Sequence, residues 1–233
     1  MANTIVVYSG GLDSTTLLYH LLAAGHEVKA LSVNYGQRHM ARESAAADAI
    51  CRGLGIERRT ADLTALVAFF GGNALTNHGT DLPQGGYTAD TIGVTTVPNR
   101  NMVLLSVGIA WAASLGFDGV AFGSHGGEHT NYPDCYPPFA EAMDRAAEVC
   151  DFRPLRVLAP FVHWVKADIV RRGAELRVPF ELAWSCYAGG ESHCGKCSTC
   201  VDRRTAFRQA GVPDPTVYLE SAGGHRPHGT QSG

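Results

Sequence analysis

The sequence predicts an α/β fold: a doubly wound, mainly parallel sheet with helices on both faces, followed by a small C-terminal zinc-binding segment. Three observations carry this prediction. Short β-branched runs alternate with segments of helical period, a glycine-rich turn follows the first run, and four cysteines crowd one late segment. Strands that alternate with helices are joined by right-handed crossovers, which build a parallel sheet covered on both faces.

Predicted strands and helices alternate through the first part of the chain. Ile5 to Tyr8 is a short β-branched run, and we expect a buried strand there. Leucines then recur at helical spacing from Asp13 until Gly25, which ends the first helix. The same two patterns predict, in order, a strand at 28–33, a helix at 39–52 and a strand at 57–61.

The second half alternates regular and irregular segments. Residues 71–98 are rich in Gly, Thr, Asn and Pro without a sustained period, so we expect a lid or binding loop. An apolar helix and a strand follow at 102–115 and 119–122, and residues 123–138 are again irregular. The pattern ends with a strand at 155–159, a helix at 165–176 and a short helix at 203–209.

These elements divide the chain of 233 residues into three expected parts. They are a nucleotide-binding α/β domain over 1–176, a zinc-binding helical and loop subdomain over 177–220, and a disordered tail over 221–233. A net charge of -3 offers no basic face for nucleic acid. We recognise no signal peptide and no apolar run long enough to span a membrane, so we expect a cytoplasmic protein without a membrane partner.

The turn after the first strand has the composition of a phosphate-binding loop, Ser9-Gly10-Gly11-Leu12-Asp13-Ser14. Ligands of open α/β sheets bind where the strands end, and the free N–H groups at a helix start attract phosphate. A carboxylate beside phosphates makes chemical sense when it holds Mg2+, so Asp13 is the candidate magnesium ligand. The alternative is a tight turn in which Asp13 only caps the helix.

This loop resembles the SGGxDS motif of the PP-loop pyrophosphatases, which cleave ATP to AMP and pyrophosphate. The kinase-type alternative is excluded, because no Gly-Lys-Ser/Thr follows the glycines. The resemblance implies that ATP lies against the loop and the first turns of the helix, at Tyr8, Ser9, Gly10, Gly11, Leu12, Asp13, Ser14, Thr15, Thr16, Leu17 and Leu18.

Four late cysteines have metal-ligand spacing, C-x7-C-x2-C-x2-C, at Cys186, Cys194, Cys197 and Cys200. The overlapping C-x2-C pairs bring three thiolates to one ion, Gly195 allows the turn, and Cys186 folds back as the fourth ligand. Four thiolates leave no open position, so we expect a structural Zn2+. The alternatives are His193 in place of one thiolate, or four unligated buried cysteines.

Two cations elsewhere are candidates for contact with the phosphates. Arg100 stands at the start of the apolar helix, where a cation opposes the helix dipole unless it meets an anion. Lys166 also lies early in a helix, where it can reach ATP phosphates or remain an ordinary solvated lysine. Cys135, beside Asp134 in an irregular segment, is a lesser candidate for the same site.

Together these segments resemble the QueC family, the 7-cyano-7-deazaguanine synthases of queuosine biosynthesis within the Rossmann-like PP-loop superfamily. The matching stretches follow the family order and lie at 8–16, 35–39, 97–101, 132–135, 185–187 and 194–200. The resemblance implies catalytic roles for Asp13, Arg100 and Lys166. It implies substrate contacts from Tyr35, Gln37, Arg38, His39, Asn99, Tyr132 and Asp134, although a surface turn at 35–39 and a helix cap at Asn99 would also explain those residues.

The resemblance further implies a reaction. A small deazapurine acid, 7-carboxy-7-deazaguanine, reacts with ammonia and two ATP to give the nitrile, two AMP and two pyrophosphate, through adenylated carboxylate and amide intermediates. It also implies that the zinc segment helps to form the wall of the substrate pocket and that the protein is a homodimer.

One region departs from the family pattern. Glu128-His129-Thr130-Asn131 stands in place of a Gly-Asp-His run, and Tyr136 stands where an arginine is usual. Loss of that arginine removes a bidentate clamp for a carboxylate or a purine edge. This departure leaves open a paralogous PP-loop ligase that stops at the amide or acts on a related deazapurine or another carboxylate. Two further alternatives are independent of it: a PP-loop tRNA-modifying enzyme, and a zinc-knuckle module that binds nucleotide only for regulation.

Overall fold

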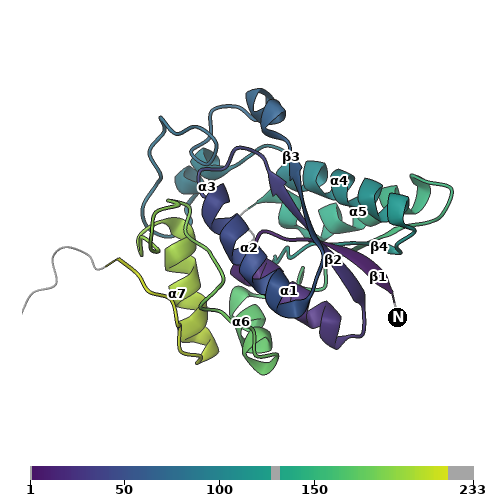
Figure 1. The fold of residues 1–233 in the computed structure, drawn as a ribbon. Coiled ribbons are helices and arrows are strands. Elements are labelled where there is room, and N and C mark those ends of the chain that lie inside the picture. Colours follow the sequence, from purple (N-terminus) through teal and green to yellow (C-terminus); the bar gives the residue numbers. More distant parts are fainter. Residues whose placement is uncertain (1, 127–131, 220–233) are drawn as a thin grey trace, which may run out of the picture.

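A computed structural model describes residues 2–126 and 132–219 of the chain (Figure 1). The departure at 128–131 and the expected tail at 221–233 therefore lie outside the described residues. Five parallel strands form one sheet in the order β3-β2-β1-β4-β5. Their bounds are β1 Asn3–Val7, β2 Glu27–Asn34, β3 Arg58–Asp62, β4 Gly119–Ala121 and β5 Arg156–Leu158.

The strand order confirms the doubly wound fold. Strand β1 lies at the centre, where Val6 pairs with Ala30 of β2 on one side and Ala121 of β4 on the other. The chain winds outward to β3, then returns past β1 to add β4 and β5. The winding thus reverses between β1 and β4, and the carboxyl ends of such strands diverge there to form a crevice for a ligand.

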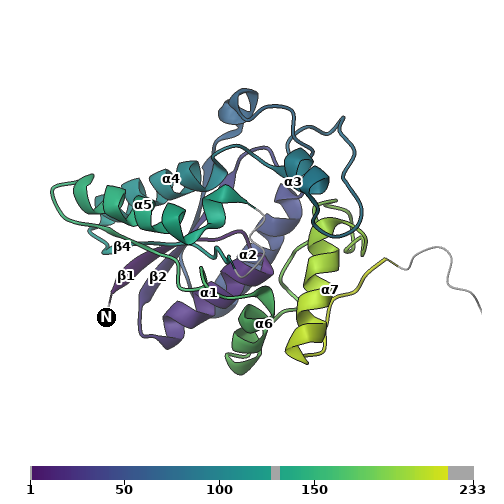
Figure 2. The same ribbon diagram turned by 180° about the vertical axis from the view of Figure 1, so that it is seen from behind.

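Helices cover both faces of the sheet (Figures 1 and 2). Successive strand residues point to opposite faces, so Ile5 and Val6, both 0% exposed, belong to two separate cores. The Val6 core is covered by α1 (Leu12–Ala23), α2 (Met40–Leu54), α6 (Lys166–Glu175) and α7 (Ser198–Ala210). The Ile5 core is covered by α4 (Arg100–Leu115) and α5 (Pro137–Val149).

The segments expected to be irregular contain more regular structure than their composition indicates. Helix α5 begins with Pro137 in its first turn and buries Ala140, Met143 and Ala147 on one face. Proline fits a first helical turn because the N–H it lacks would have no partner there. Helix α3 (Ala89–Thr95) and the short 3-10 helix η2 (Pro133–Cys135) also lie in such segments, and a second 3-10 helix, η1 (Thr64–Phe69), precedes the first of them.

The C-terminal part packs against the sheet domain. Phe180 and Phe207 share the core of α1 and α6 and contact each other edge to face, with ring centroids 5.0 Å apart. The expected boundary at residue 176 stays a prediction. Within the described residues, no helix has both the length and the apolar character needed to cross a membrane.

Candidate active site at the carboxyl ends of the strands

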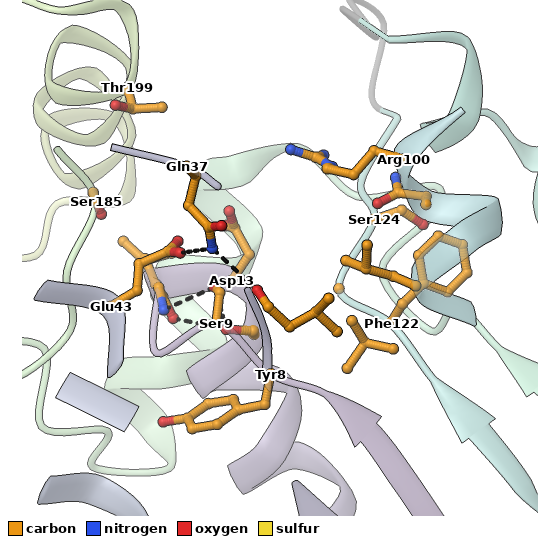
Figure 3. Close-up of a pocket in the computed structure, with 18 of the residues that line it drawn as sticks. Tyr8, Ser9, Asp13, Gln37, Glu43, Arg100, Phe122, Ser124, Ser185 and Thr199 are labelled. Atoms are coloured by element: carbon orange, nitrogen blue, oxygen red, sulfur yellow. Dashed lines mark hydrogen bonds between the residues drawn. The ribbon is translucent and has the colours of Figure 1, made fainter. Parts of the chain in front are cut away.

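A cavity of about 270 Å³ opens where the strands end (Figure 3). Its floor is the turn between β1 and α1, and its walls come from segments far apart in the sequence. These are the ends of β2 and β4, the starts of α2, α4 and α6, the loop at Tyr87, and the C-terminal segment from Trp184 to Asp202.

The floor requires glycine at position 10. Gly10 has a φ of +79°, a left-handed conformation that L side chains rarely adopt. A Cβ there would lie 2.7 Å from the backbone nitrogen of Ala47 and 2.7 Å from the backbone oxygen of Glu43, both in α2. The turn therefore passes close to α2 without a side chain between them, and the start of α1 remains open to the cavity.

Hydroxyl groups and free amides meet at this helix start. The Ser9 hydroxyl accepts a hydrogen bond from the Gly11 N–H at 3.1 Å and lies 3.2 Å from the Ser14 hydroxyl. The first N–H groups of a helix have no partner within it and carry partial positive charge. The α1 start can therefore bind an anion with backbone amides and two hydroxyls.

A chain of charges crosses the floor. Lys166 Nζ lies 3.2 Å from Asp13 Oδ2 and 2.8 Å from Asp202 Oδ2, and His125 Nε2 lies 3.9 Å from the same Asp13 oxygen. Burial opposes ionisation of Asp13, but Lys166 and His125 outweigh it and hold its pKa below the usual value. Burial also opposes the charge on Lys166, yet the two carboxylates raise its pKa, so both charges persist at neutral pH.

One oxygen of Asp13 has no protein partner. Its Oδ1 is buried and makes no hydrogen bond in the described part of the chain, and the same is true of the hydroxyl of Ser124. Buried polar atoms are normally hydrogen-bonded, so an unpartnered carboxylate oxygen in a cavity indicates a ligand contact. The atom fits a divalent cation that accompanies a polyphosphate, because carboxylate oxygen is the preferred ligand of Mg2+.

Arg100 extends its guanidinium into the cavity, on the side opposite Glu43 and Gln37 (Figure 3). No carboxylate of the described residues lies within 4.0 Å of it. Burial opposes its charge, but Tyr35 and Tyr187 outweigh burial and raise its pKa above the usual value. The result is a permanent cation without an ion-pair partner among those residues, as required of a side chain that binds an anionic ligand.

The predicted site residues divide into two groups. Tyr35, Gln37, His39, Tyr132, Arg100 and Lys166 line the cavity, as do Tyr8, Ser9, Gly11, Leu12, Asp13 and Ser14 of the loop. Gly10, Thr15, Thr16, Leu17 and Leu18 are not among its lining residues, and the last four are fully buried below the loop.

Arg38, Asn99 and Asp134 are also absent from the lining. Arg38 donates to the carbonyl oxygens of Asn77 and Thr80 at 2.8 and 2.9 Å. Asn99 has a φ of +56° at the N-cap of α4, and Asp134 accepts a hydrogen bond from the Asn101 N–H at 3.0 Å. In this structure the Arg38 side chain supports a loop and the Asp134 side chain supports the α4 start, whereas the Asn99 side chain makes no cap hydrogen bond. The predicted substrate contacts of all three stay predictions.

Cys135 lines the cavity as an un-ionised thiol. It accepts a hydrogen bond from the Asn101 side chain at 3.4 Å. Burial, and then the adjacent Asp134, raise the pKa of this thiol to about 11. A nucleophilic cysteine needs its thiolate form near neutral pH, so this environment does not activate Cys135.

The late cysteines converge as their spacing predicts. The four sulfur atoms lie within 4.8 Å of one another, and two pairs, Cys186–Cys197 and Cys194–Cys200, are 3.9 and 4.0 Å apart. Gly195 makes the turn with a φ of +72°. We call residues 186–200 the cysteine knuckle. Its four sulfurs can hold one metal ion.

His193 does not join this cluster. Its Nε2 accepts a hydrogen bond from the Ser185 N–H at 3.1 Å, and its ring packs on Trp184 with centroids 4.2 Å apart. Burial lowers the pKa of this imidazole to about 4. His193 therefore supports the chain that enters the knuckle.

The cysteine knuckle also shapes the cavity. It pairs with the loop before α3, where Gly85 donates to the Lys196 carbonyl at 2.8 Å and Gln84 bridges to Cys197. This pairing brings Tyr87 to Tyr187, whose hydroxyls are 3.3 Å apart, and both side chains line the cavity. The C-terminal segment thus forms one wall of the site.

Sequence reasoning did not identify several lining residues. They include Glu43, Ser124, His125, Tyr87, Tyr187 and Asp202. A weak signal existed for Glu43, an acidic residue in a first helical turn four positions after His39, and for Asp202, two positions after a metal-ligand cysteine. Tyr87 lies in a long irregular loop that has no comparable signal.

The parallel sheet, the glycine-rich loop and a cavity at the strand ends that contains Lys166 and Arg100 define a nucleotide-binding protein of the PP-loop class. More particularly, the chain belongs to the family described as queuosine biosynthesis protein QueC, whose model matches residues 3–211. It is 44% identical over 214 residues to the 7-cyano-7-deazaguanine synthase of Chromohalobacter salexigens, covering 92% of this chain and 85% of that one. It is 46% identical over 220 residues to the same-named protein of Paracoccus denitrificans, covering 94% of each chain.

Solved structures are more distant. The U34-tRNA thiolase NcsA from Methanococcus maripaludis superposes with a TM-score of 0.49 and 15% identity, over 90% of this chain and 72% of that one. Family membership therefore comes from the sequence comparisons, which extend over nearly the whole chain.

Proposed function

We propose that this chain is an ATP-dependent carbon–nitrogen ligase that converts 7-carboxy-7-deazaguanine and ammonia to 7-cyano-7-deazaguanine, with release of AMP and pyrophosphate. One observation carries the proposal. A single cavity joins a phosphate-binding loop, a carboxylate whose buried Oδ1 makes no hydrogen bond with the described residues, and Arg100, which has no ion-pair partner among them. The relatives named 7-cyano-7-deazaguanine synthase support the identity of the acceptor.

The chemistry explains why ATP is needed twice. A carboxylate is a poor acyl donor, because oxide would have to leave. Attack of the carboxylate oxygen on the α-phosphate of ATP expels pyrophosphate, and ammonia then displaces AMP to give the amide. A second attack, by the amide oxygen, expels another pyrophosphate. Loss of AMP and of the two amide protons then leaves the nitrile.

Residues of this chain neutralise the negative charge that develops on the phosphates in these steps. The α1 amides and the Ser9 and Ser14 hydroxyls face the phosphates, and Lys166 lies beside them. Arg100 supplies a second cation from the other side of the cavity. In-line displacement at phosphorus depends on positioning and charge neutralisation more than on a protein nucleophile. The un-ionised Cys135 is consistent with that requirement.

Two metal ions extend the proposal. Asp13 would hold Mg2+ through its free oxygen, and this ion would neutralise the polyphosphate. The cysteine knuckle would hold a structural Zn2+. A tetrahedron with Zn–S bonds of about 2.3 Å has edges of roughly 3.8 Å. The sulfur–sulfur distances of 3.9 and 4.0 Å match that geometry.

Product analysis tests the reaction. Purified protein is incubated with 7-carboxy-7-deazaguanine, ammonium chloride and Mg-ATP, and the products are followed by mass spectrometry. The expected result is the nitrile with two AMP for each nitrile formed. Product that stops at the amide would favour the amide-forming alternative. Unchanged acid, or ADP in place of AMP, would contradict the proposal.

The partners of the enzyme remain predictions. We propose a cytoplasmic homodimer that acts on small molecules, and the net charge of -3 supports the absence of a nucleic-acid substrate. Sedimentation analysis would test the dimer. A gel-shift assay with tRNA would test the RNA alternative, which predicts a salt-sensitive complex.

A further inference from the structure

The wall of the cavity opposite Arg100 carries a carboxylate that the reaction scheme does not use. Glu43 lies in the first turn of α2 and lines the cavity with its side chain 16% exposed (Figure 3). No lysine or arginine of the described residues lies within 4.0 Å of it. A partly buried carboxylate without a cation is unfavourable unless another group donates hydrogen bonds to it.

Gln37 holds this carboxylate in place. Its amide nitrogen donates to Glu43 Oε2 and to the Val33 carbonyl, both at 3.1 Å. Its amide oxygen accepts from the Tyr35 N–H at 2.9 Å, and the residue is only 4% exposed. Gln37 therefore uses both ends of its amide on the protein, and it positions Glu43 where that side chain lines the cavity.

The other oxygen of Glu43 accepts no hydrogen bond from the part of the chain that the structure describes. The closest recorded group is His39 Nε2 at 3.6 Å from Oε1, beyond hydrogen-bond distance. Burial holds the pKa of His39 below its usual value, so the imidazole is neutral at neutral pH and supplies no counter-charge. Each carboxylate oxygen can accept two hydrogen bonds. Both oxygens thus retain acceptor capacity toward the cavity.

The same wall suits a planar ligand. His39 packs against Tyr187 with ring centroids 5.3 Å apart, and Trp184 lines the cavity beside them. Aromatic side chains contact a flat heterocycle through its face, while a carboxylate at the edge contacts its donors. The wall therefore combines an aromatic surface for the face of a planar ligand with a carboxylate acceptor for the N–H groups at its edge.

From this arrangement we propose that Glu43 determines acceptor specificity by accepting two hydrogen bonds from the adjacent ring N–H and amino group of a guanine-type heterocycle. The inference rests on the proposed function and adds a contact to it. A guanine-type edge presents two neighbouring donors that match the two oxygens of a carboxylate. An adenine-type edge presents one donor beside a ring-nitrogen acceptor, which the carboxylate repels.

Enzyme kinetics and binding separate this contact from other roles. Glu43→Gln keeps the size of the side chain and the acceptor for Gln37 but places an N–H2 donor against a ligand donor. We expect the KM for 7-carboxy-7-deazaguanine to rise roughly 10- to 100-fold, as for the loss of one charge-assisted hydrogen bond, while the KM for ATP is unchanged. Glu43→Asp keeps the charge and should restore part of the loss.

Calorimetry without ATP tests the contact directly. The wild-type protein should bind 7-carboxy-7-deazaguanine more tightly than its analogue without the 2-amino group, and Glu43→Gln should bind the two equally. Asp48→Asn is the matched control, because Asp48 lies on the same helix, outside the cavity, and pairs with Arg58. That variant should retain the preference. Circular dichroism of each variant confirms the fold.

The outcomes are distinct. An unchanged preference in Glu43→Gln overturns the inference, and so does a raised KM for ATP, which would place Glu43 against the nucleotide ribose. A wild-type protein that binds neither ligand also overturns it. If the wild type forms no nitrile yet Glu43→Gln abolishes the binding preference, the proposed function fails and the contact stands.

Discussion

The cysteine knuckle and the cavity beside it use buried polar groups in opposite ways. In the C-terminal segment that flanks the knuckle, the fully buried Arg203 donates to the Phe180 carbonyl at 2.8 Å and the Ser185 hydroxyl at 3.1 Å, and it pairs with Asp214. In the cavity, Asp13 Oδ1 is buried without a partner in the described residues. Saturated polar groups stabilise a fold, whereas unsaturated ones bind ligands.

Loss of a metal ligand should have the largest effect. Cys197→Ser leaves three thiolates, and structural zinc in small domains contributes on the order of 10 kcal/mol to folding. We expect elemental analysis to show loss of zinc, and thermal unfolding to show a large fall in Tm. Cys150→Ser changes an exposed cysteine outside the cluster and should alter neither quantity. Full zinc content with an unchanged Tm in Cys197→Ser would refute the structural role.

Loss of the buried arginine should come next. Arg203→Met leaves Asp214 without its cation and three acceptors at the knuckle without a donor, and removal of one partner from a buried pair costs about 3–5 kcal/mol. Urea unfolding should show this decrease in the free energy of unfolding. Arg204→Met is the matched control, because Arg204 is adjacent but exposed. Its effect should stay below about 1 kcal/mol. An equal decrease in the free energy of unfolding in the two variants would contradict a stabilising role for the buried hydrogen bonds of Arg203.

In the cavity, a substitution should lower the activity and leave the stability of the fold unchanged. Asp13→Asn keeps the shape of the side chain and removes the charge that would hold Mg2+. We expect turnover to fall about 10²- to 10³-fold, as for the loss of one electrostatic group at a reacting centre. The Tm should stay close to that of the wild type, because Lys166 keeps its ion pair with Asp202. Asp81→Asn changes an exposed loop residue and should change neither. A large fall in Tm with Asp13→Asn would give Asp13 a structural role instead.

Acidification should weaken the fold modestly through the cavity histidines. Burial lowers the pKa values of His39 and His125, so between their folded values and about 6.5 the unfolded chain binds more protons. The free energy of unfolding is therefore highest above about pH 6.5. It decreases as the pH falls below that value, by up to about 1.4 kcal/mol per pH unit for each histidine.

Urea unfolding at several pH values between 5 and 7.5 measures this dependence. His125→Gln should reduce the slope of the free energy of unfolding against pH, because it removes one of the two cavity histidines. His78→Gln changes an exposed histidine and serves as the control. The depressed pKa of Asp13 acts in the same direction but only near pH 4 and below, so it does not contribute in this window. An identical slope in His125→Gln would show that its imidazole does not titrate with unfolding.

Local pattern predicted most of the fold, but not all of it. The five strands and the helices α1, α2, α4 and α6 lie close to the residues predicted from the hydrophobic period and from the glycine and proline residues that end each element. Helix α5 was missed, although Pro137 is a helix-start signal and Ala140, Met143 and Ala147 recur on one face. The preceding Gly- and Pro-rich residues obscured that period. Helix α7 begins at Ser198, earlier than expected, because the knuckle positions its first turn.

Two parts of this protein follow from the sequence itself. The phosphate loop and the cysteine knuckle are short contiguous motifs, and their chemistry depends on spacing along the chain. Only the tertiary structure decided that Glu43, Arg100 and Asp202 share one cavity, and that the knuckle brings Tyr87 into its wall. The reason is physical: side chains from distant segments meet where parallel strands end, and their contacts depend on sheet order and helix packing. No local pattern encodes those distances.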